Sequence, residues 1–256
     1  MPTDGTYLAH VAASVGVASI RPGTLVVVSL PIGNLEDISI RALRMLKSVS
    51  VAAAENPART RALLRTYSIS TPVVGFRDRD EVHPASDLIA SLLAGGTAAL
   101  VCDAGTPLVA DAGCRVVRAA IDAGLTVTAA PGPVAAIVAL VISGFAEGGF
   151  VFDGFPPRAR YQRESYFIGL AAEKRTILLY ETRRFLADTL RRLSDALGPE
   201  RKVFIARDLT KPGETHYYGT LGDAKERFRD PIAGEFVLVV SRPRQKQKPN
   251  ITSTQH

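Results

Sequence analysis

The segment TAALVCDAGTPLVADAG, residues 97–113, contains the unit from which the fold is built. It opens with a continuous apolar run of strand length, which is typical of a strand buried on both faces of a sheet. A turn with two carboxylates and two glycines follows, and residues 115–123 then have a helical pattern. A buried strand followed by a turn and a helix predicts a parallel or mixed sheet covered by helices on both faces.

The same alternation of strand and helix continues along the chain. The segments predicted as strands are 24–30, 49–54, 97–103, 125–130, 150–153, 176–181, 202–207, 216–220 and 235–240. The segments predicted as helices are 40–47, 60–66, 86–94, 115–123, 134–143, 161–172, 185–197 and 222–229. The last strands follow one another closely, which suggests antiparallel pairing in the second half of an α/β protein.

Two α/β domains are predicted, because three glycines between Ser143 and Gly149 interrupt the helical pattern. The predicted parts are a flexible N-terminal extension (1–23), an N-terminal α/β domain (24–145), a C-terminal α/β domain (146–241) and a basic flexible tail (242–256). The extension lacks the basic segment and continuous apolar block of a signal peptide. The longest apolar run, 133–142, is far shorter than the roughly 20 residues that span a bilayer. We therefore expect a soluble, cytoplasmic protein.

The composition is that of a folded chain, with 46% hydrophobic and 22% charged residues among 256. It excludes disordered, collagen-like and disulfide-stapled classes. The only cysteines are Cys102 and Cys114, too few for a zinc ribbon. We therefore expect reduced thiols and no bound metal.

Positive charge is concentrated in the second half of the chain. Residues 1–145 contain eleven Lys or Arg and eleven Asp or Glu, whereas residues 146–256 contain twenty and fourteen, which gives the net charge of +6. The tail contains four basic residues and no acidic ones: Arg242, Arg244, Lys246 and Lys248. Such a tail is either a nucleic-acid arm or a solvated terminus that keeps the protein soluble.

Chemistry is expected at the carboxyl ends of the first strands, where open α/β sheets collect their ligands. Three turns follow these strands: SLPIGNLEDIS (29–39), the turn at 102–113 and PGP (131–133). None of them contains the glycine pattern of a dinucleotide site or the lysine of a P-loop, which argues against both motifs. Three such turns at corresponding strand ends predict a binding site.

Four stretches carry a family resemblance: SLPIGNLED (29–37), DAGTPL (103–108), PGP (131–133) and RDLTK (207–211). They resemble, in order, the bacterial 16S rRNA (cytidine-2′-O)-ribose methyltransferases of the tetrapyrrole methylase superfamily. The resemblance implies two α/β domains with S-adenosylmethionine in the cleft between them, and a homodimer. It also implies that the substrate is a cytidine in the decoding region of 16S rRNA within the small ribosomal subunit.

The same resemblance implies which residues contact the cofactor. In the first domain these are Ile32, Gly33, Gly105, Thr106, Val109, Ala110, Val134 and Ala135. In the second domain they are Glu181, Ala206 and Glu235, at corresponding strand ends. Small residues suit this role, because the backbone must come close to the ligand.

A general base is expected, because a ribose hydroxyl is a poor nucleophile until its proton leaves. The candidates are the carboxylates of Glu55 and Asp103, at neighbouring strand ends, with Lys211 as a third. Glu55 closes an apolar strand, where partial desolvation would favour proton uptake. The alternative for Glu55 is a salt bridge to Arg59.

RNA contacts are expected from the basic second half. Arg158, Arg160 and Arg163 are interleaved with Tyr161, which combines phosphate neutralisation with a ring for base stacking. A further set of arginines is expected to be ordinary solvated surface: Arg183, Arg184, Arg191 and Arg192.

Some positions depart from the family pattern. Asn56-Pro57 follow Glu55 where the family has Asp-Thr, and Cys102 takes the place of a serine. The segments 76–81 and 180–184 lack the histidines familiar there, which leaves any catalytic histidine unidentified.

Two other functions remain open. One keeps the cofactor and changes the substrate to a tetrapyrrole, another small molecule or a modified histidine on a protein. The other is a non-catalytic ribosome assembly factor, given the altered segment after the second strand.

Overall fold

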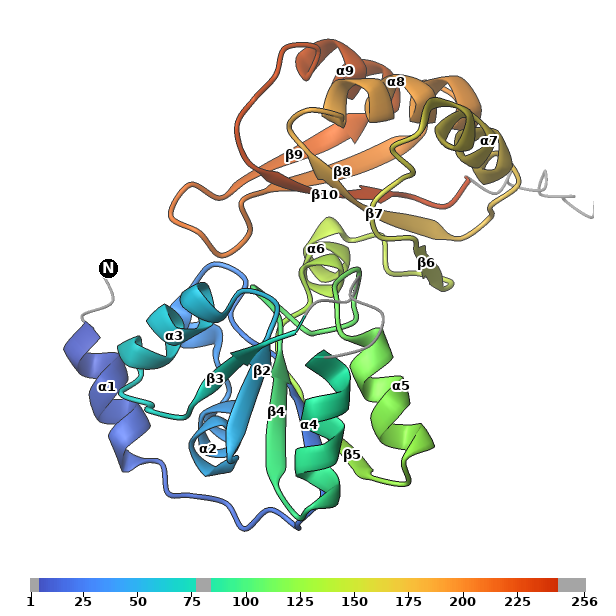
Figure 1. The fold of residues 1–256 in the computed structure, drawn as a ribbon. Helices are drawn as coiled ribbons and strands as arrows, with labels where there is room; N and C mark the ends of the chain where they lie inside the picture. The colour runs from blue at the N-terminus through green and yellow to red at the C-terminus, as the bar shows by residue number, and fades with distance from the viewer. Residues whose placement is uncertain (1–4, 77–83, 244–256) are drawn as a thin grey trace, which may run out of the picture. The chain divides into compact units, whose positions relative to one another are not determined.

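The computed structural model of the chain describes residues 5–76 and 84–243, which divide into two compact units (Figure 1). The first unit runs to Ala139 and also includes Arg207–Thr215. The second comprises Leu140–Ala206 and the part of the chain that begins at His216. The helix α6 (Ala135–Ser143) is shared between them. The structure thus assigns Arg207–Thr215 to the first unit, whereas the sequence analysis placed this loop in the C-terminal domain.

A five-stranded parallel sheet forms the centre of the first unit; four of its strands were predicted, in a parallel or mixed sheet. Its strands lie in the order β3 (Val73–Gly75), β2 (Val51–Ala54), β4 (Thr97–Val101), β1 (Thr24–Val28) and β5 (Thr126–Ala130). Every neighbouring pair is parallel. The carboxyl ends of β2, β4, β1 and β5 therefore lie along one edge of the sheet.

Helices cover both faces of this sheet. They are α2 (Ile40–Ser48), α3 (Pro57–Thr66), α4 (Pro84–Leu93) and α5 (Cys114–Asp122). Alternate residues of β1 point to opposite faces, so Val26 packs in a cluster with α2 and α3 while Leu25 packs in a cluster with α4 and α5. Local capping sets the helix starts: the Ser39 hydroxyl accepts from the amide of Ala42.

The segment predicted to be a flexible N-terminal extension contains a helix, α1 (Gly5–Ser14). Leu8 and Ala12 are buried in the cluster that covers one face of the first sheet. The ammonium group of Lys47 donates to the carbonyl oxygens of Ala12 and, at 3.2 Å, of Val15, and so caps the end of this helix. The described part of the extension is therefore ordered by packing against segments far along the chain.

The second unit contains a mixed sheet. Its strands lie in the order β6 (Phe150–Phe152), β7 (Thr176–Thr182), β10 (Glu235–Val240), β8 (Lys202–Arg207) and β9 (Thr215–Thr220). Strands β6 and β7 are parallel, whereas β7 and β10 are antiparallel, which confirms the antiparallel pairing expected in this half.

Three helices pack on one face of the second sheet (Figure 1): α7 (Arg160–Leu170), α8 (Leu186–Leu197) and α9 (Leu221–Arg227). Phe167 of α7 and Leu190 of α8 meet Ile177 and Leu238 of the sheet in one buried cluster. The strongly basic part of the tail and the segment 77–83 lie outside the described residues.

No helix between residues 5–76 or 84–243 has the length and apolarity needed to cross a membrane. Within the same ranges, no group of three or more His, Cys, Asp or Glu residues comes together that could hold a metal ion.

Candidate cofactor site at the edge of the first sheet

The turns after β1, β4 and β5 are joined to one another by hydrogen bonds. The amide of Leu30 donates to the carbonyl oxygen of Gly105 at 2.8 Å, and the reverse bond is 3.0 Å long. The Ser29 and Thr106 hydroxyls are 2.8 Å apart, and Thr106 donates to the Pro133 carbonyl oxygen at 3.1 Å. The three turns predicted from the sequence therefore form one connected structure at the carboxyl edge of the sheet.

Two glycines at this junction lie where the turns pack closely against one another. Gly105 has a φ of +78°, and a Cβ there would lie 3.2 Å from Ile32 Cγ2 and 3.6 Å from the Pro133 carbonyl oxygen. A Cβ at Gly132 would lie 2.7 Å from the Cβ of Ser29. We call these three connected turns the cradle; at both glycines their backbones pack closely together.

The turn after β4 also contains unusual backbone conformations. Leu108 and Ala110 have φ angles of +71° and +57°, which are rare for residues other than glycine. Hydrogen bonds within the turn hold them, including one of 3.3 Å from the Val109 amide to the Thr106 carbonyl oxygen. Strained residues of this kind persist only where the surroundings fix them, and they cluster at functional sites.

Cys102 is buried beneath the same turn. Its thiol donates to the carbonyl oxygens of Ala104 at 3.2 Å and Gly105 at 3.5 Å. Burial raises the pKa of this thiol far above its ordinary value, and the charge of Asp111 raises it further. The thiol therefore stays protonated and supplies the hydrogen-bond donor that a serine hydroxyl would supply.

Two of the candidate bases occupy different environments. The Asp103 side chain is 34% exposed, and its Oδ2 lies 3.3 Å from Arg59 Nη1. Its Oδ1 is buried and has no hydrogen-bond partner among the residues that the structure describes. Glu55, which follows β2, is exposed, so burial gives little support to the partial desolvation expected for it. Arg59, weighed as a partner of Glu55, makes its ion pair with Asp103.

Lys211, the third candidate, belongs to the loop that the structure assigns to the first unit. Its Cγ would lie 2.7 Å from a Cβ at Gly33, so the structure brings it to the first turn. Its Nζ is 3.6 Å from Asp208 Oδ1.

Val134 and Ala135 lie at the start of α6 and are half-buried. The carbonyl oxygen of Val134 accepts from the amides of Ile137 and Val138, which closes the first helical turn. The first-unit residues assigned to the cofactor from the sequence are therefore brought together on connected turns. Ser29, Gly132 and Pro133 were missed as contributors, although the motifs quoted from the sequence include them.

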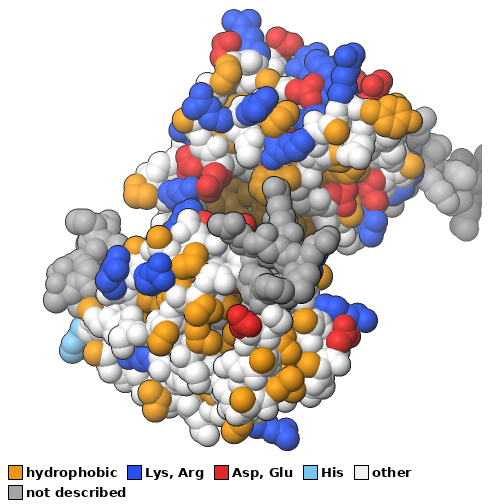
Figure 2. Space-filling view, in the orientation of Figure 1, with side chains coloured by type: hydrophobic (Ala, Val, Ile, Leu, Met, Phe, Trp, Pro, Cys, Tyr) orange, Lys and Arg blue, Asp and Glu red, His pale blue; other side chains and the backbone are white. Residues whose placement is uncertain are grey.

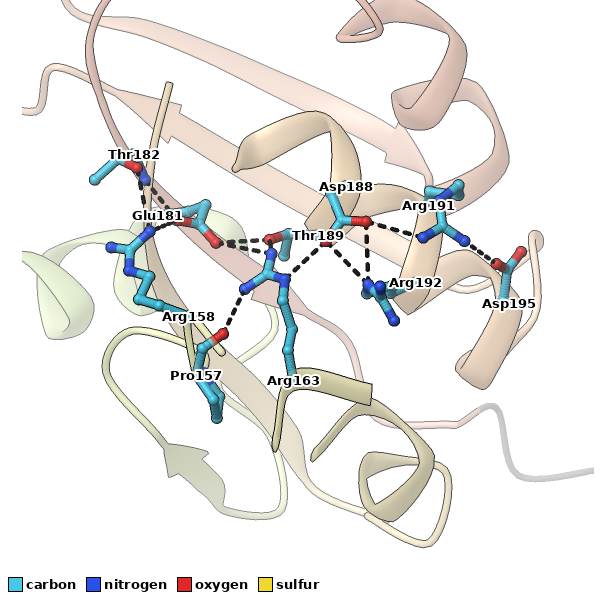
Figure 3. A network of polar contacts seen from close by, with 10 residues as sticks. All are labelled: Pro157, Arg158, Arg163, Glu181, Thr182, Asp188, Thr189, Arg191, Arg192 and Asp195. Atoms are coloured by element: carbon cyan, nitrogen blue, oxygen red, sulfur yellow. Dashed lines mark hydrogen bonds and ion pairs between the residues drawn. The ribbon is translucent and has the colours of Figure 1, made fainter. Parts of the chain in front are cut away.

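In the second unit, the carboxylate of Glu181 is enclosed by the protein's own donors (Figure 3). Its Oε2 accepts from the Thr189 hydroxyl at 2.6 Å and from Arg163 at 3.4 Å. Its Oε1 accepts from Arg158 at 3.3 Å. The side chain of Glu181 is fully buried, so these bonds occupy the group that was expected to contact the cofactor.

The structure corrects the expectation that Arg163 binds RNA. Its side chain is only 4% exposed, and its Nε lies 2.7 Å from Asp188 Oδ2 (Figure 3). A buried arginine that is paired with carboxylates belongs to the interior of the unit and cannot reach a phosphate. Asp188 also receives hydrogen bonds from Arg191 and Arg192, so these two arginines are partly neutralised.

The other predicted RNA contacts are accessible. Arg160 is exposed and Tyr161 is 81% exposed at the start of α7. Arg158 is partly exposed, and its guanidinium lies 4.5 Å from the centre of the Phe185 ring. Figure 2 shows basic and acidic side chains intermixed over the visible face of the second unit.

The other two second-unit residues that were expected to contact the cofactor also lie at strand ends. Ala206 is buried near the end of β8, and the exposed Glu235 opens β10 opposite Thr182.

Residues 24–225 match the family model described as Tetrapyrrole (Corrin/Porphyrin) Methylases. The chain therefore belongs to the tetrapyrrole methylase family. Within it, two curated relatives are both named ribosomal RNA small subunit methyltransferase I. The one from Xylella fastidiosa is 40% identical over 86% of this chain and 81% of its own. The one from Thermotoga maritima is 37% identical over 86% of this chain and 98% of its own.

Solved structures of the family share the fold. Uroporphyrin-III-C-methyltransferase from Thermus thermophilus is 21% identical, with a TM-score of 0.60 over 86% of this chain and 94% of its own. The cobalt precorrin-4 methyltransferase is 14% identical, with a TM-score of 0.64 over 86% and 95%. These likenesses confirm the predicted fold class, two α/β domains of the tetrapyrrole methylase type.

Proposed function

We propose that this protein transfers the methyl group of S-adenosylmethionine to the ribose 2′-hydroxyl of a cytidine in the decoding region of 16S rRNA, within the small ribosomal subunit. The observation that carries the proposal is the backbone cradle formed by the turns after β1, β4 and β5. It occurs in a chain that is 37–40% identical to proteins named for methylation of small-subunit ribosomal RNA.

The cradle fits S-adenosylmethionine. Gly105 and Gly132 let the backbones of the three turns pack closely together, and Ile32 adds an apolar side chain beside Gly105. Cofactor sites combine such apolar walls with a few backbone and hydroxyl groups, here including Thr106. When bound, the cofactor supplies a methyl group made electrophilic by the sulfonium.

The protein's main contribution is to hold the reacting groups in line. Displacement at a methyl group needs the attacking oxygen opposite the departing sulfur. A rigid cradle holds the cofactor in a fixed orientation before the reaction begins. The hydrogen bonds among Ser29, Thr106 and Pro133 fix the cradle independently of any ligand.

Asp103 is the carboxylate that we assign as the base. It follows β4 beside the cradle, its side chain is 34% exposed, and no donor among residues 5–76 and 84–243 engages its Oδ1. Arg59 holds the other oxygen and so fixes the orientation of the carboxylate. Glu55 is exposed and Lys211 lies against Asp208, so we rank both below Asp103.

The exposed residues of α7 are the proposed RNA contacts in the second unit. Arg160 offers a charge to a phosphate, and Tyr161 beside it offers a ring on which a base can stack. Arg158 is the third proposed RNA contact, because its side chain is partly exposed. Contacts of this kind supply affinity, whereas the choice of one cytidine depends on the shape of the assembled subunit.

A homodimer and a cytoplasmic location complete the proposal. Helix α6 is apolar up to Ser143, yet Ile137 and Val141, four residues apart on one face, are 41% and 68% exposed. An apolar helix face of this kind suits burial against a second copy. Sedimentation of the purified protein tests the dimer.

The proposed location follows from the substrate. A ribosomal substrate requires the compartment in which ribosomal subunits assemble, which is the cytoplasm.

Methyl transfer to ribosomal particles tests the function. S-adenosylmethionine with a labelled methyl group is incubated with small subunits that lack ribose methylation, with naked 16S rRNA and with uroporphyrinogen. We expect label on the small subunits. Label on uroporphyrinogen alone would replace the proposal with a tetrapyrrole methyltransferase, and binding to subunits without any label would leave an assembly factor.

A further inference from the structure

The loop Arg207–Thr215 is in direct contact with the first turn of the cradle, although the two are far apart in sequence. The amide of Asn34 donates to the Thr210 hydroxyl at 3.0 Å. A Cβ at Gly33 would lie 2.6 Å from that hydroxyl and 2.7 Å from the carbonyl oxygen of Leu209. No φ in the left-handed region explains this glycine, so the approach of the loop is the reason for it.

The loop is strained in a way that directs Thr210 toward the turn. Asp208 and Thr210 have φ angles of +53° and +62°, and such an angle is exceptional for a β-branched residue. The loop's own bonds hold this shape: the Thr210 amide donates to Glu214 Oε2 at 2.6 Å, and the Lys211 amide to the Asp208 carbonyl oxygen at 3.0 Å. Leu209 is buried between the two strained residues and anchors the loop.

We propose that Thr210 is a positioning residue for the cofactor: its hydroxyl fixes the turn Ile32–Asn34 and thereby sets the affinity for S-adenosylmethionine. Thr210 acts through the turn and touches no reacting atom. The inference rests on the proposed function, because that function places the cofactor at this turn. The same contact also places Lys211 beside Gly33.

Three substitutions separate this role from a general effect on folding. Thr210→Val removes the hydroxyl that accepts from the Asn34 amide but keeps the β-branched shape. The backbone strain at this position is therefore the same as in the unmodified protein. Thr210→Ser keeps the hydroxyl and is the rescue variant. Thr215→Val, at the exposed far end of the same loop, is the control.

The readout is the dissociation constant of S-adenosylmethionine, measured by calorimetry without RNA at a temperature where each variant is folded. We expect Thr210→Val to raise it about three- to tenfold, the effect of one hydrogen bond, and Thr210→Ser and Thr215→Val to stay within about twofold. In the methylation assay, the KM for the cofactor should rise while kcat changes little. Equal dissociation constants for Thr210→Val and the unmodified protein would overturn the inference, as would a Thr210→Ser variant as weak as Thr210→Val.

Two further measurements apply if Thr210→Val does not fold. Gly33→Ala pushes the same contact apart from the other side and should weaken cofactor binding by at least the same factor. In the unmodified protein, the Asn34 amide should be protected from hydrogen exchange, and rapid exchange there would overturn the inference. If the unmodified protein binds no S-adenosylmethionine at all, the proposed function fails instead, so the two failures are distinguishable.

Discussion

The Ser29 hydroxyl lies 2.8 Å from the Thr106 hydroxyl, and the direction of this bond follows from the next one. Thr106 uses its single hydroxyl proton to donate to the carbonyl oxygen of Pro133 at 3.1 Å. Ser29 must therefore donate to Thr106. This chain of hydrogen bonds crosses the ends of β1, β4 and β5, so the cradle is fixed by the protein before a ligand arrives.

Replacing Gly105 by alanine should strongly lower the affinity for S-adenosylmethionine. The new Cβ would lie between Ile32 and Pro133. The alanine would also have to adopt a φ of +78°, which is strained for any residue with a side chain. Gly124→Ala is a matched control, because Gly124 has a φ of +72° but no atom of the described residues lies within 4 Å of the added carbon. Both variants should lose about 1 kcal/mol of stability from the backbone strain. Calorimetry should show weakened binding only for Gly105→Ala, and equal affinities in the two would remove Gly105 from the site.

Asp103→Asn should lower kcat by about 10²-fold or more while leaving the affinity for the cofactor nearly unchanged. An amide cannot take up the hydroxyl proton, but it has the shape of the carboxylate. Glu55→Gln is the comparison, and we expect it to retain most of its activity, since Glu55 is exposed. The test is single-turnover methylation of small subunits at saturating cofactor. Full activity in Asp103→Asn together with a large loss in Glu55→Gln would transfer the role of base to Glu55.

Arg160→Ala and Arg163→Ala, three residues apart on α7, should affect different properties of the protein. Arg163→Ala leaves the fully buried Glu181 without one of its charged partners and should lower the free energy of unfolding by about 3 kcal/mol. Arg160→Ala should leave stability unchanged but weaken RNA binding and reduce its salt dependence by about one phosphate contact. Urea unfolding and binding at several salt concentrations measure the two effects. A stable Arg163→Ala variant with a reduced salt slope would contradict the structural role of Arg163.

Acid should weaken the second unit through Asp188. Burial by itself raises the pKa of this carboxyl, but hydrogen bonds from Arg163, Arg191 and Arg192 outweigh it and lower the pKa to about 2. Because the folded pKa lies below the unfolded one, the stabilisation is complete above about pH 4 and is lost as the pH falls toward 2. Asp188→Asn should therefore cost at least about 1 kcal/mol at pH 7, after allowance for solvent screening. Urea unfolding should show that the loss of stability in Asp188→Asn becomes smaller between pH 4 and pH 2. A loss that is independent of pH would show that it does not come from the charge of Asp188.

Most of the fold could be predicted from the sequence, because strands and helices here have strong local patterns. The predicted strand 202–207 coincides with β8, and the predicted helix 40–47 differs from α2 by one residue. The strand β3 was missed because its three residues are partly exposed and too short to show a pattern. The helix α1 was missed because its order depends on packing against distant segments and on the cap from Lys47.

The site could be predicted only where the motif residues themselves form it. Gly105 and Thr106 follow a strand end, where the topology places ligands, so their position is readable from the sequence. The burial of Arg163 was not readable, since its partners Glu181 and Asp188 lie 18 and 25 residues further along the chain. The contact between Thr210 and Asn34 spans 176 residues, so only the folded chain reveals it.

The position of the transferred methyl group tests the central claim most directly. Small subunits methylated with labelled S-adenosylmethionine are digested to nucleosides, and mass spectrometry identifies the labelled species and its place in the 16S rRNA. We predict a single labelled nucleoside, 2′-O-methylcytidine, in the decoding region. Label on a base, or on a ribose elsewhere in the 16S rRNA, would contradict the account.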